Sequence, residues 1–217
     1  ENYRYHLGPD IQVGNIYPVM YAKTFFDGMK AEGQKNIINL LRCAWAGSQK
    51  YGALVWSGDI KSSFPSMKNQ VAAGLNMGIA GIPWWTTDIG GFFGANVNDP
   101  EFHELLIRWF EYGCFCPVMR LHGYRWPLQP QYGTTGGATC VSGAPNEVWS
   151  NTDQVYEILS DYLRLRERML PYITELMEAA HEKGTPVMRP LFYDFPDDKD
   201  SWNVETEYMV GPKVLGK

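Results

Sequence analysis

Cysteine is scarce in this chain, with four residues in 217. The spacing of Cys43, Cys114, Cys116 and Cys140 fits no zinc template, and Cys114 lies too close to Cys116 for an easy mutual disulfide. We therefore expect buried free thiols, no metal site and no cofactor. This cysteine content leaves open whether the chain works in a cytoplasmic, periplasmic or extracellular compartment.

The chain also lacks long apolar runs and an excess of positive charge. No run approaches the roughly 20 apolar residues of a membrane span, so we expect no membrane partner. The chain has 19 Lys and Arg against 24 Asp and Glu, a net charge of -5, which argues against a nucleic-acid partner. The segment 42–47 also lacks the glycines of a phosphate loop, which disfavours a doubly wound nucleotide-binding domain.

Aromatic residues, in contrast, are abundant, with eight Trp and thirteen Tyr. Most aromatic side chains belong to a core. A surplus beside glycine-rich loops also suits flat, hydroxylated ligands, which present apolar ring faces and many hydrogen-bonding groups.

Apolar runs alternate with helical patterns along the first 120 residues. The sequence predicts strands at 36–41, 51–56, 78–85 and 116–120, and helices at 17–33, 66–77 and 99–113. Such alternation is typical of parallel strands joined by helical crossovers.

The remaining segments follow other patterns. Residues 124–150 are rich in Pro, Gly, Thr and Gln and predict a long functional loop or lid. Residues 153–183 predict a helix that is kinked or broken at Pro171, with Arg164 to Arg168 on a solvated face. Residues 186–192 and 207–211 predict short β segments of another unit.

Polar side chains follow each predicted strand. They are Arg42, then Trp56 with Asp59, then Trp84 and Trp85 with Asp88, and finally Arg120 with His122. Parallel α/β folds open all strand carboxyl ends on one face, so these residues are expected to converge. Each also has a structural interpretation. Asp59 could cap a helix, the two arginines could form ion pairs with Asp59 or Asp88, and Trp85 could be packing.

This set of side chains suits carbohydrate chemistry. Glycosidic cleavage needs a carboxylic acid that protonates the leaving oxygen, with a second carboxylate about 5–5.5 Å away in retaining enzymes. Asp, Arg and His hold sugar hydroxyls through charged hydrogen bonds, and indole faces stack on sugar rings.

Four motifs in order resemble glycoside hydrolase family 31, which includes α-glucosidases and α-xylosidases. They are Arg42–Gly47, Trp56–Asp59, Gly81–Phe92 and Met119–His122, and the segments 186–192 and 194–196 resemble the region after that family's barrel. The likeness covers nearly the whole chain.

The resemblance implies a retaining α-glycosidase on a (β/α)8 TIM barrel that acts on an α-linked oligosaccharide or glycoside with terminal glucose or xylose. It assigns the general acid/base to Asp59. It also implies that the sugar subsite is lined by Arg42, Trp56, Asp88, Phe92, Arg120 and His122. We add Trp85 as a substrate-binding candidate, because indole faces stack on sugar rings.

One departure is clear. The family's nucleophile lies in a Trp-x-Asp-type motif, which is absent from these 217 residues. We expect residues 1–185 to be the second half of the barrel, strands five to eight, and residues 186–217 to be a linker and the start of a β-sandwich. Such a half-barrel is expected to be inactive alone and to self-associate or contact the missing half.

Two other hypotheses remain. The chain could be a module that binds a sugar without turning it over, which calorimetry with monosaccharides would distinguish. It could instead be a small doubly wound domain of unrelated function, although the missing phosphate loop disfavours this.

Overall fold

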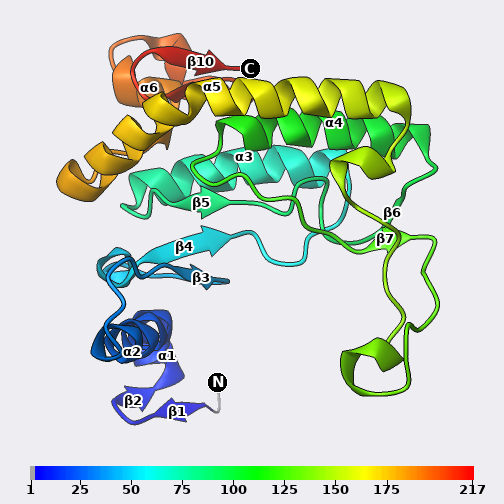
Figure 1. Cartoon of the computed structure of the whole chain (residues 1–217). Coiled ribbons are helices and arrows are strands. Elements are labelled where there is room, and N and C mark those ends of the chain that lie inside the picture. The colour runs from blue at the N-terminus through cyan, green and yellow to red at the C-terminus, as the bar shows by residue number, and fades with distance from the viewer. Residues whose placement is uncertain (1–2) are drawn as a thin grey trace.

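The fold is built on a short parallel sheet. Figure 1 shows the computed structural model, which describes residues 3–217. Strands β3 (Asn39–Leu41), β4 (Ala53–Trp56) and β5 (Trp85–Thr86) are paired in that order and run parallel. The predicted parallel arrangement is therefore confirmed, and the three carboxyl ends lie at one edge of the sheet.

Helices pack beside this sheet in sequence order. In Figure 1, α3 (Phe64–Ile79), α4 (Pro100–Phe115) and α5 (Asp153–Lys183) lie on the β5 side, and α2 (Tyr17–Ala31) lies beyond β3. Asp99 caps α4 by accepting a hydrogen bond from the Glu101 amide. The predicted apolar face of this helix is buried, and the burial of each large side chain stabilises the fold by about 1.5–3 kcal/mol. It consists of Phe102, Leu105, Leu106, Trp109 and Phe110.

The predicted strand at 78–85 is wrong over most of its length. Helix α3 continues to Ile79, and extended structure begins only at Trp85. Gly81 has a φ of +80°, and its amide bonds the Gly78 carbonyl, which closes the end of the helix. The apolar run is therefore shared among a helix end, a turn and a short strand, all of which bury similar side chains.

The predicted strand at 116–120 is also not formed. Pro117 has no amide hydrogen to contribute to a ladder, and a single backbone bond joins the segment to β5, from the Val118 amide to the Trp85 carbonyl at 3.2 Å. The segment still runs beside β5, so Arg120 follows it to the same edge of the sheet.

Helix α5 is continuous from Asp153 to Lys183, with Pro171 inside it. Thr152 caps its start, and Figure 1 shows its axis bending in the second half, so the predicted kink is confirmed and a break into two helices is not. The prediction of a solvated face is wrong for Arg166. Its guanidinium is partly buried and donates to the carbonyls of Cys114, Cys116 and Pro117 at the end of α4.

A second, antiparallel sheet follows α5. Strands β8 (Met188–Arg189), β9 (Tyr208–Val210) and β10 (Val214–Gly216) are ordered β10-β9-β8, with α6 (Leu191–Asp194) between β8 and β9. Short strands are confirmed in both predicted segments, Met188–Arg189 in 186–192 and Tyr208–Val210 in 207–211, but Leu191 and Phe192 belong to α6 instead. Their sheet is joined to α5 where the Tyr172 hydroxyl donates to the Val210 carbonyl at 2.9 Å.

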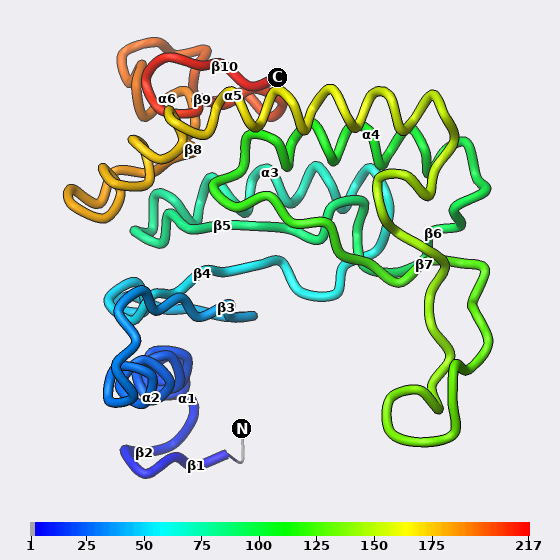
Figure 2. The backbone as a smooth tube through the Cα atoms, viewed as in Figure 1, coloured from blue at the N-terminus to red at the C-terminus, as the bar shows by residue number. Residues whose placement is uncertain are grey.

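Two segments extend from this body. Before α2, a hairpin of β1 (Arg4–Tyr5) and β2 (Gly8–Pro9) leads into α1 (Asp10–Val13). Strand β7 (Arg125–Trp126) pairs in parallel with β6 (Ala95–Asn96), and the chain then forms the long loop that the composition predicted. Figure 2 shows this loop leaving the helices and returning to α5.

The four thiols are free, but they differ in burial. Cys114 and Cys116 are buried as expected, whereas Cys43 and Cys140, which lie outside helices and strands, are exposed. Within residues 3–217, no helix combines the length and the apolar character that crossing a membrane requires.

Candidate active site

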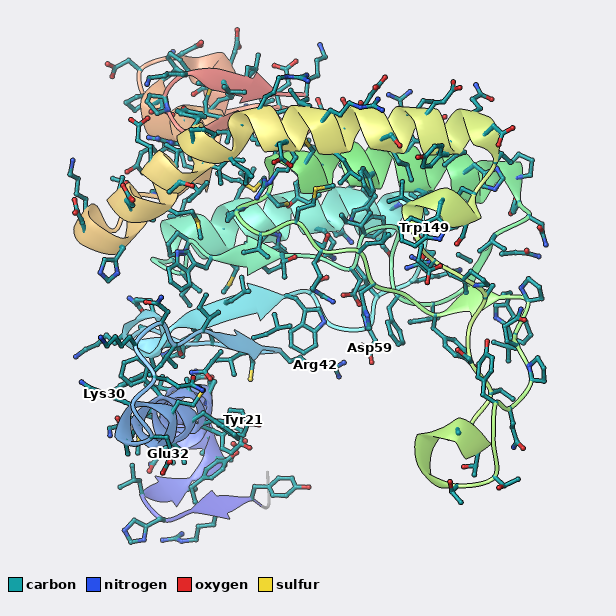
Figure 3. All side chains as sticks on the ribbon, viewed as in Figure 1. Tyr21, Lys30, Glu32, Arg42, Asp59 and Trp149 are labelled. Atoms are coloured by element: carbon teal, nitrogen blue, oxygen red, sulfur yellow. The ribbon has the colours of Figure 1, made fainter. Side chains whose placement is uncertain are left out.

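Asp59 lies just beyond the carboxyl end of β4, as predicted. Its Oδ1 forms an ion pair with Nη2 of Arg42 at 2.8 Å, and Arg42 follows β3. The guanidinium also lies 5.5 Å from the Trp56 ring, which orients it by a cation–π contact. Figure 3 shows Arg42 and Asp59 side by side, and both side chains are about half exposed. The carboxylate is therefore held in place and remains open to a ligand.

The alternative in which Asp59 caps a helix is excluded. The cap of α3 is Ser63, whose hydroxyl accepts from the Ser66 amide at 3.3 Å. Gly58 precedes Asp59 with a φ of +75°, a conformation that lets the chain turn sharply after β4. The turn at Gly58 and the ion pair with Arg42 thus position Asp59, which does not cap the following helix.

Asp88 is a buried carboxylate at the end of β5. One oxygen, Oδ1, accepts from Nη2 of Arg120, and the residue has no solvent exposure. The other oxygen, Oδ2, and Nε of Arg120 have no hydrogen-bond partner within residues 3–217. A buried polar atom without a partner costs about 1–3 kcal/mol. The pair thus offers an acceptor and a donor that the fold itself leaves unused.

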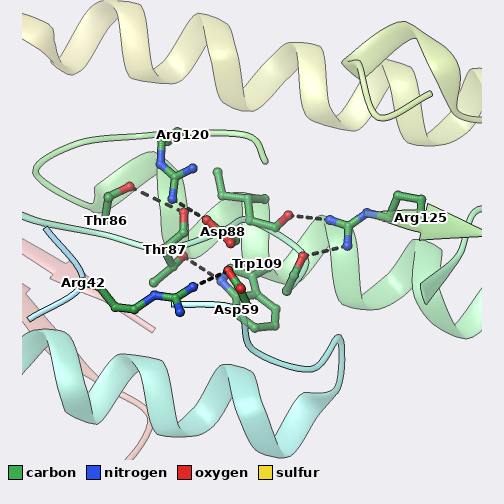
Figure 4. A network of polar contacts seen from close by, with 10 residues as sticks. Arg42, Asp59, Thr86, Thr87, Asp88, Trp109, Arg120 and Arg125 are labelled. Carbon is green, nitrogen blue, oxygen red and sulfur yellow. Dashed lines mark hydrogen bonds and ion pairs between the residues drawn. The ribbon is translucent and has the colours of Figure 1, made fainter. Parts of the chain in front are cut away.

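The charge state of Asp88 reflects this position. Burial raises the pKa of its carboxyl, and the nearby Arg120 guanidinium opposes the rise without cancelling it. The Asp59 carboxylate raises the pKa of Asp88 further, so the two acids are close enough to interact. Figure 4 shows both ion pairs, Arg42–Asp59 and Arg120–Asp88, in one network of polar contacts.

A group of packed rings, those of Phe92, His122 and Tyr124, lies next to these acids. The Phe92 ring lies 5.5 Å from the His122 ring and 6.5 Å from the Tyr124 ring, measured between centroids. The Tyr124 amide also bonds the Phe92 carbonyl, which fixes the loop after β5 against the segment after α4. Phe92 and His122 are therefore brought together, as the sequence predicted.

Trp85 does not belong to this surface. It is 4% exposed, and its Nε1 donates to the Tyr112 hydroxyl at 3.2 Å beneath Gly74 of α3. Its side chain therefore points from β5 into the helices, and the packing interpretation holds. Trp84 lines a different cavity, together with Gln49 and Gly184. Neither indole reaches the acids.

Arg125 is the important residue that the motifs did not indicate. It is fully buried in β7 and donates to the carbonyls of Gly91 at 2.6 Å and Ile89 at 3.0 Å. The loop it supports is tight, because a Cβ on Gly91 would lie 2.6 Å from Ser62 Cα. Burial lowers the pKa of Arg125 to about 10, which leaves it charged at neutral pH. Arg125 thereby fixes the backbone between Asp88 and Phe92 (Figure 4).

This chain matches two models of one family. Residues 2–176 match the glycosyl hydrolases family 31 TIM-barrel domain, and residues 184–217 match the family 31 C-terminal domain. The chain belongs to glycosyl hydrolase family 31. Its parallel strands and their helices are therefore part of a (β/α)8 barrel domain, as the motifs implied. Within residues 3–217, no three His, Cys, Asp or Glu side chains are grouped so that they could hold a metal ion.

Its relatives are glycosidases of larger size. A crystal structure of a family 31 α-xylosidase from a soil metagenome, complexed with xylose, is 60% identical with a TM-score of 0.93, covering 99% of this chain and 32% of that one. An α-xylosidase of Saccharolobus solfataricus is 35% identical over 96% of this chain and 26% of its own length. A family 31 glucosidase of Pseudescherichia vulneris, itself uncharacterised, is 67% identical over 58% of this chain and 24% of its own. This chain therefore spans about a quarter to a third of these relatives.

Proposed function

We propose that this chain forms part of the catalytic barrel of a retaining α-glycosidase, with Asp59 as general acid/base. The observation that carries the proposal is the pair of acids at one edge of the sheet. Asp59 is half exposed and held by Arg42, whereas Asp88 is buried with one free oxygen. Two carboxylates in such different surroundings are suited to different tasks.

In the first step, the Asp59 carboxylic acid donates its proton to the glycosidic oxygen as the bond to the anomeric carbon breaks. A nucleophilic carboxylate, which the Trp-x-Asp motif of the family would supply from outside these residues, bonds that carbon. In the second step, the Asp59 carboxylate takes a proton from water as the water oxygen displaces the nucleophile. Two inversions leave the anomeric configuration retained.

Arg42, Asp88, Arg120 and His122 bind the hydroxyls of the sugar that is cleaved. The unpartnered Oδ2 of Asp88 accepts from a hydroxyl, and Nε of Arg120 donates to one. Phe92 covers an apolar edge of the ring, and Trp56 acts through Arg42. The sugar thus satisfies buried polar atoms that otherwise cost the protein stability.

The cleaved sugar is xylose, with glucose as the alternative. Support comes from the 60% identical neighbour, an α-xylosidase complexed with xylose, and from a 35% identical α-xylosidase. An α-glucosidase of Saccharolobus solfataricus is also 35% identical, so the family likeness alone does not separate the two sugars.

We further propose that β3, β4, β5 and the segment 116–120 are barrel strands five to eight. The parallel order and the Val118–Trp85 backbone bond support a continuous row of four. Domain boundaries near 185 would then separate this half-barrel from the start of a β-sandwich. The exposed rings of Tyr17, Tyr21 and Phe25 on α2 would face the first half of the barrel or a second copy.

The test is turnover by the full-length enzyme that carries this chain. It should cleave phenyl α-xyloside with a larger kcat/KM than phenyl α-glucoside, and NMR should show α-xylose as the first product. Residues 1–217 alone should cleave neither. An initial β-anomer would refute the retaining mechanism. Robust turnover by residues 1–217 would refute the external nucleophile.

A further inference from the structure

We propose that the open cavity lined by residues of the segment 123–150 binds a sugar on the leaving-group side of the scissile bond. This inference rests on the proposed glycosidase function. It adds that the enzyme selects substrates whose aglycone is itself a saccharide, and it assigns that selection to the long loop after β7.

The cavity is the right size and in the right place. Its volume is about 830 Å³, within the range of small-molecule sites. It is an open cavity lined by residues between Gly123 and Ser150, and this segment lies at the end of the molecule toward which β3, β4 and β5 point (Figure 1). A ligand there would therefore lie on the side of the sheet where Asp59 and Asp88 are found.

Two large aromatic side chains line this cavity and remain exposed. Tyr132 is 75% exposed and Trp149 is 74% exposed. Core packing does not explain them, since neither ring is buried. Trp149 belongs to a short 3-10 turn, Val148–Ser150, directly before the capped start of α5, and Val148 packs against the core. An indole held on such a turn is a preformed surface for stacking on a sugar ring.

Polar groups accompany the rings. Asn146 lines the cavity, and its side-chain oxygen is fixed by Nε of Arg125 at 2.9 Å. Glu147 also lines it, and its carboxylate accepts from the Ser150 hydroxyl at 2.8 Å. Rings that stack and side chains that bind hydroxyls are the two requirements for holding a sugar.

The cavity is connected to the acids through two residues. Tyr124 lines it and stacks on Phe92, whose other neighbour is His122. Arg125 binds Asn146 on the cavity side and the Gly91 carbonyl on the acid side. The Arg125 guanidinium therefore positions both the cavity lining and the loop beside the acids, as binding of a substrate that spans the two would require.

The experiment compares two substrates in the full-length enzyme. α-Xylosyl fluoride has no sugar on the leaving side, whereas an α-xylosyl disaccharide has one. Trp149→Ala and Tyr132→Ala should each lower kcat/KM for the disaccharide by about tenfold, the effect of losing one stacking ring. Both should leave kcat/KM for the fluoride unchanged, and Trp149→Phe should recover most of the loss.

Tyr156→Ala is the matched control, because Tyr156 is an exposed aromatic residue on α5 outside the cavity. It should affect neither substrate. The inference is overturned if the cavity variants leave the disaccharide unaffected, or if they slow both substrates equally. A wild-type enzyme that cleaves neither substrate overturns the proposed function as well, so the two failures are distinguishable.

Discussion

Replacement of Asp88 by Asn should weaken sugar binding without lowering the stability of the fold. In the proposed site, the Asp88 carboxylate holds Arg120 with one oxygen and a sugar hydroxyl with the other. Asn keeps the shape and an acceptor for Arg120 but removes the charge. Hydrogen bonds to charged groups contribute about 1.5–3 kcal/mol, so kcat/KM should fall about 10- to 150-fold.

The stability of the same variant should not fall. Burial raises the pKa of Asp88 despite Arg120, so the folded state holds the proton more tightly than the unfolded chain does. Ionisation above the raised pKa therefore costs stability, and this cost disappears as the pH falls below the unfolded value of 3.8. Asp88→Asn should match or exceed the wild-type Tm at pH 7 and lose any advantage at low pH.

The assay is kcat/KM for α-xylosyl fluoride together with calorimetric Tm, both in the full-length enzyme. Asp194→Asn is a matched control, because Asp194 also pairs with an arginine, Arg189, and also has an unpartnered Oδ2. It lies in the C-terminal unit and should leave kcat/KM unchanged. The reasoning is refuted if Asp88→Asn lowers Tm by several degrees while kcat/KM is retained, since Asp88 would then be a structural partner of Arg120.

Three further predictions concern the supports of the site and the thiols. Gly91→Ala should lower Tm, because the new Cβ would lie 2.6 Å from Ser62 Cα at a φ of +75°. Gly28→Ala in α2 is the control: its Cβ meets nothing within 4 Å, so it should raise Tm slightly. Equal Tm values for the two variants would contradict the tight turn. Arg166→Met should lower Tm by removing three hydrogen bonds to the end of α4, and Arg164→Met, whose side chain is exposed, should not; similar losses would show that Arg166 is only a surface charge. A thiol reagent at pH 8 should label Cys43 and Cys140 quickly and Cys116 slowly, because burial raises the pKa of Cys116 to about 12; rapid labelling of all four would contradict the burial.

The sequence was most informative where chemistry follows a strand. Arg42, Asp59 and Asp88 each follow within three residues of an apolar run, and parallel pairing brings such positions together whatever the exact strand limits are. The partners of the acids could not be predicted. Either arginine could have paired with either carboxylate, and only the arrangement in space selects Arg42 for Asp59 and Arg120 for Asp88.

The errors have physical causes as well. In a continuously apolar segment, nothing in the pattern shows which face a side chain takes, so Trp85 could equally have lined the mouth or entered the core. Arg125 was missed because its partners, Gly91 and Asn146, are distant in sequence and two of its hydrogen bonds go to backbone carbonyls. A hydrogen bond to a backbone carbonyl requires no particular side chain at that position, so no sequence motif indicates it. The strand at 116–120 failed because Pro117 removes a ladder donor from an otherwise suitable run.

The central claim is that Asp59 is the general acid/base, and its most direct test is the leaving-group dependence of Asp59→Ala. The measurement is kcat/KM for aryl α-xylosides over a series of phenol pKa values, in the full-length enzyme. Protonation by a positioned acid contributes about 10²–10⁴-fold, so poor leaving groups should slow by that factor while the most acidic phenols, which need no proton, change little. Equal rates for wild type and variant with poor leaving groups, or the same loss for every phenol, would contradict the assignment.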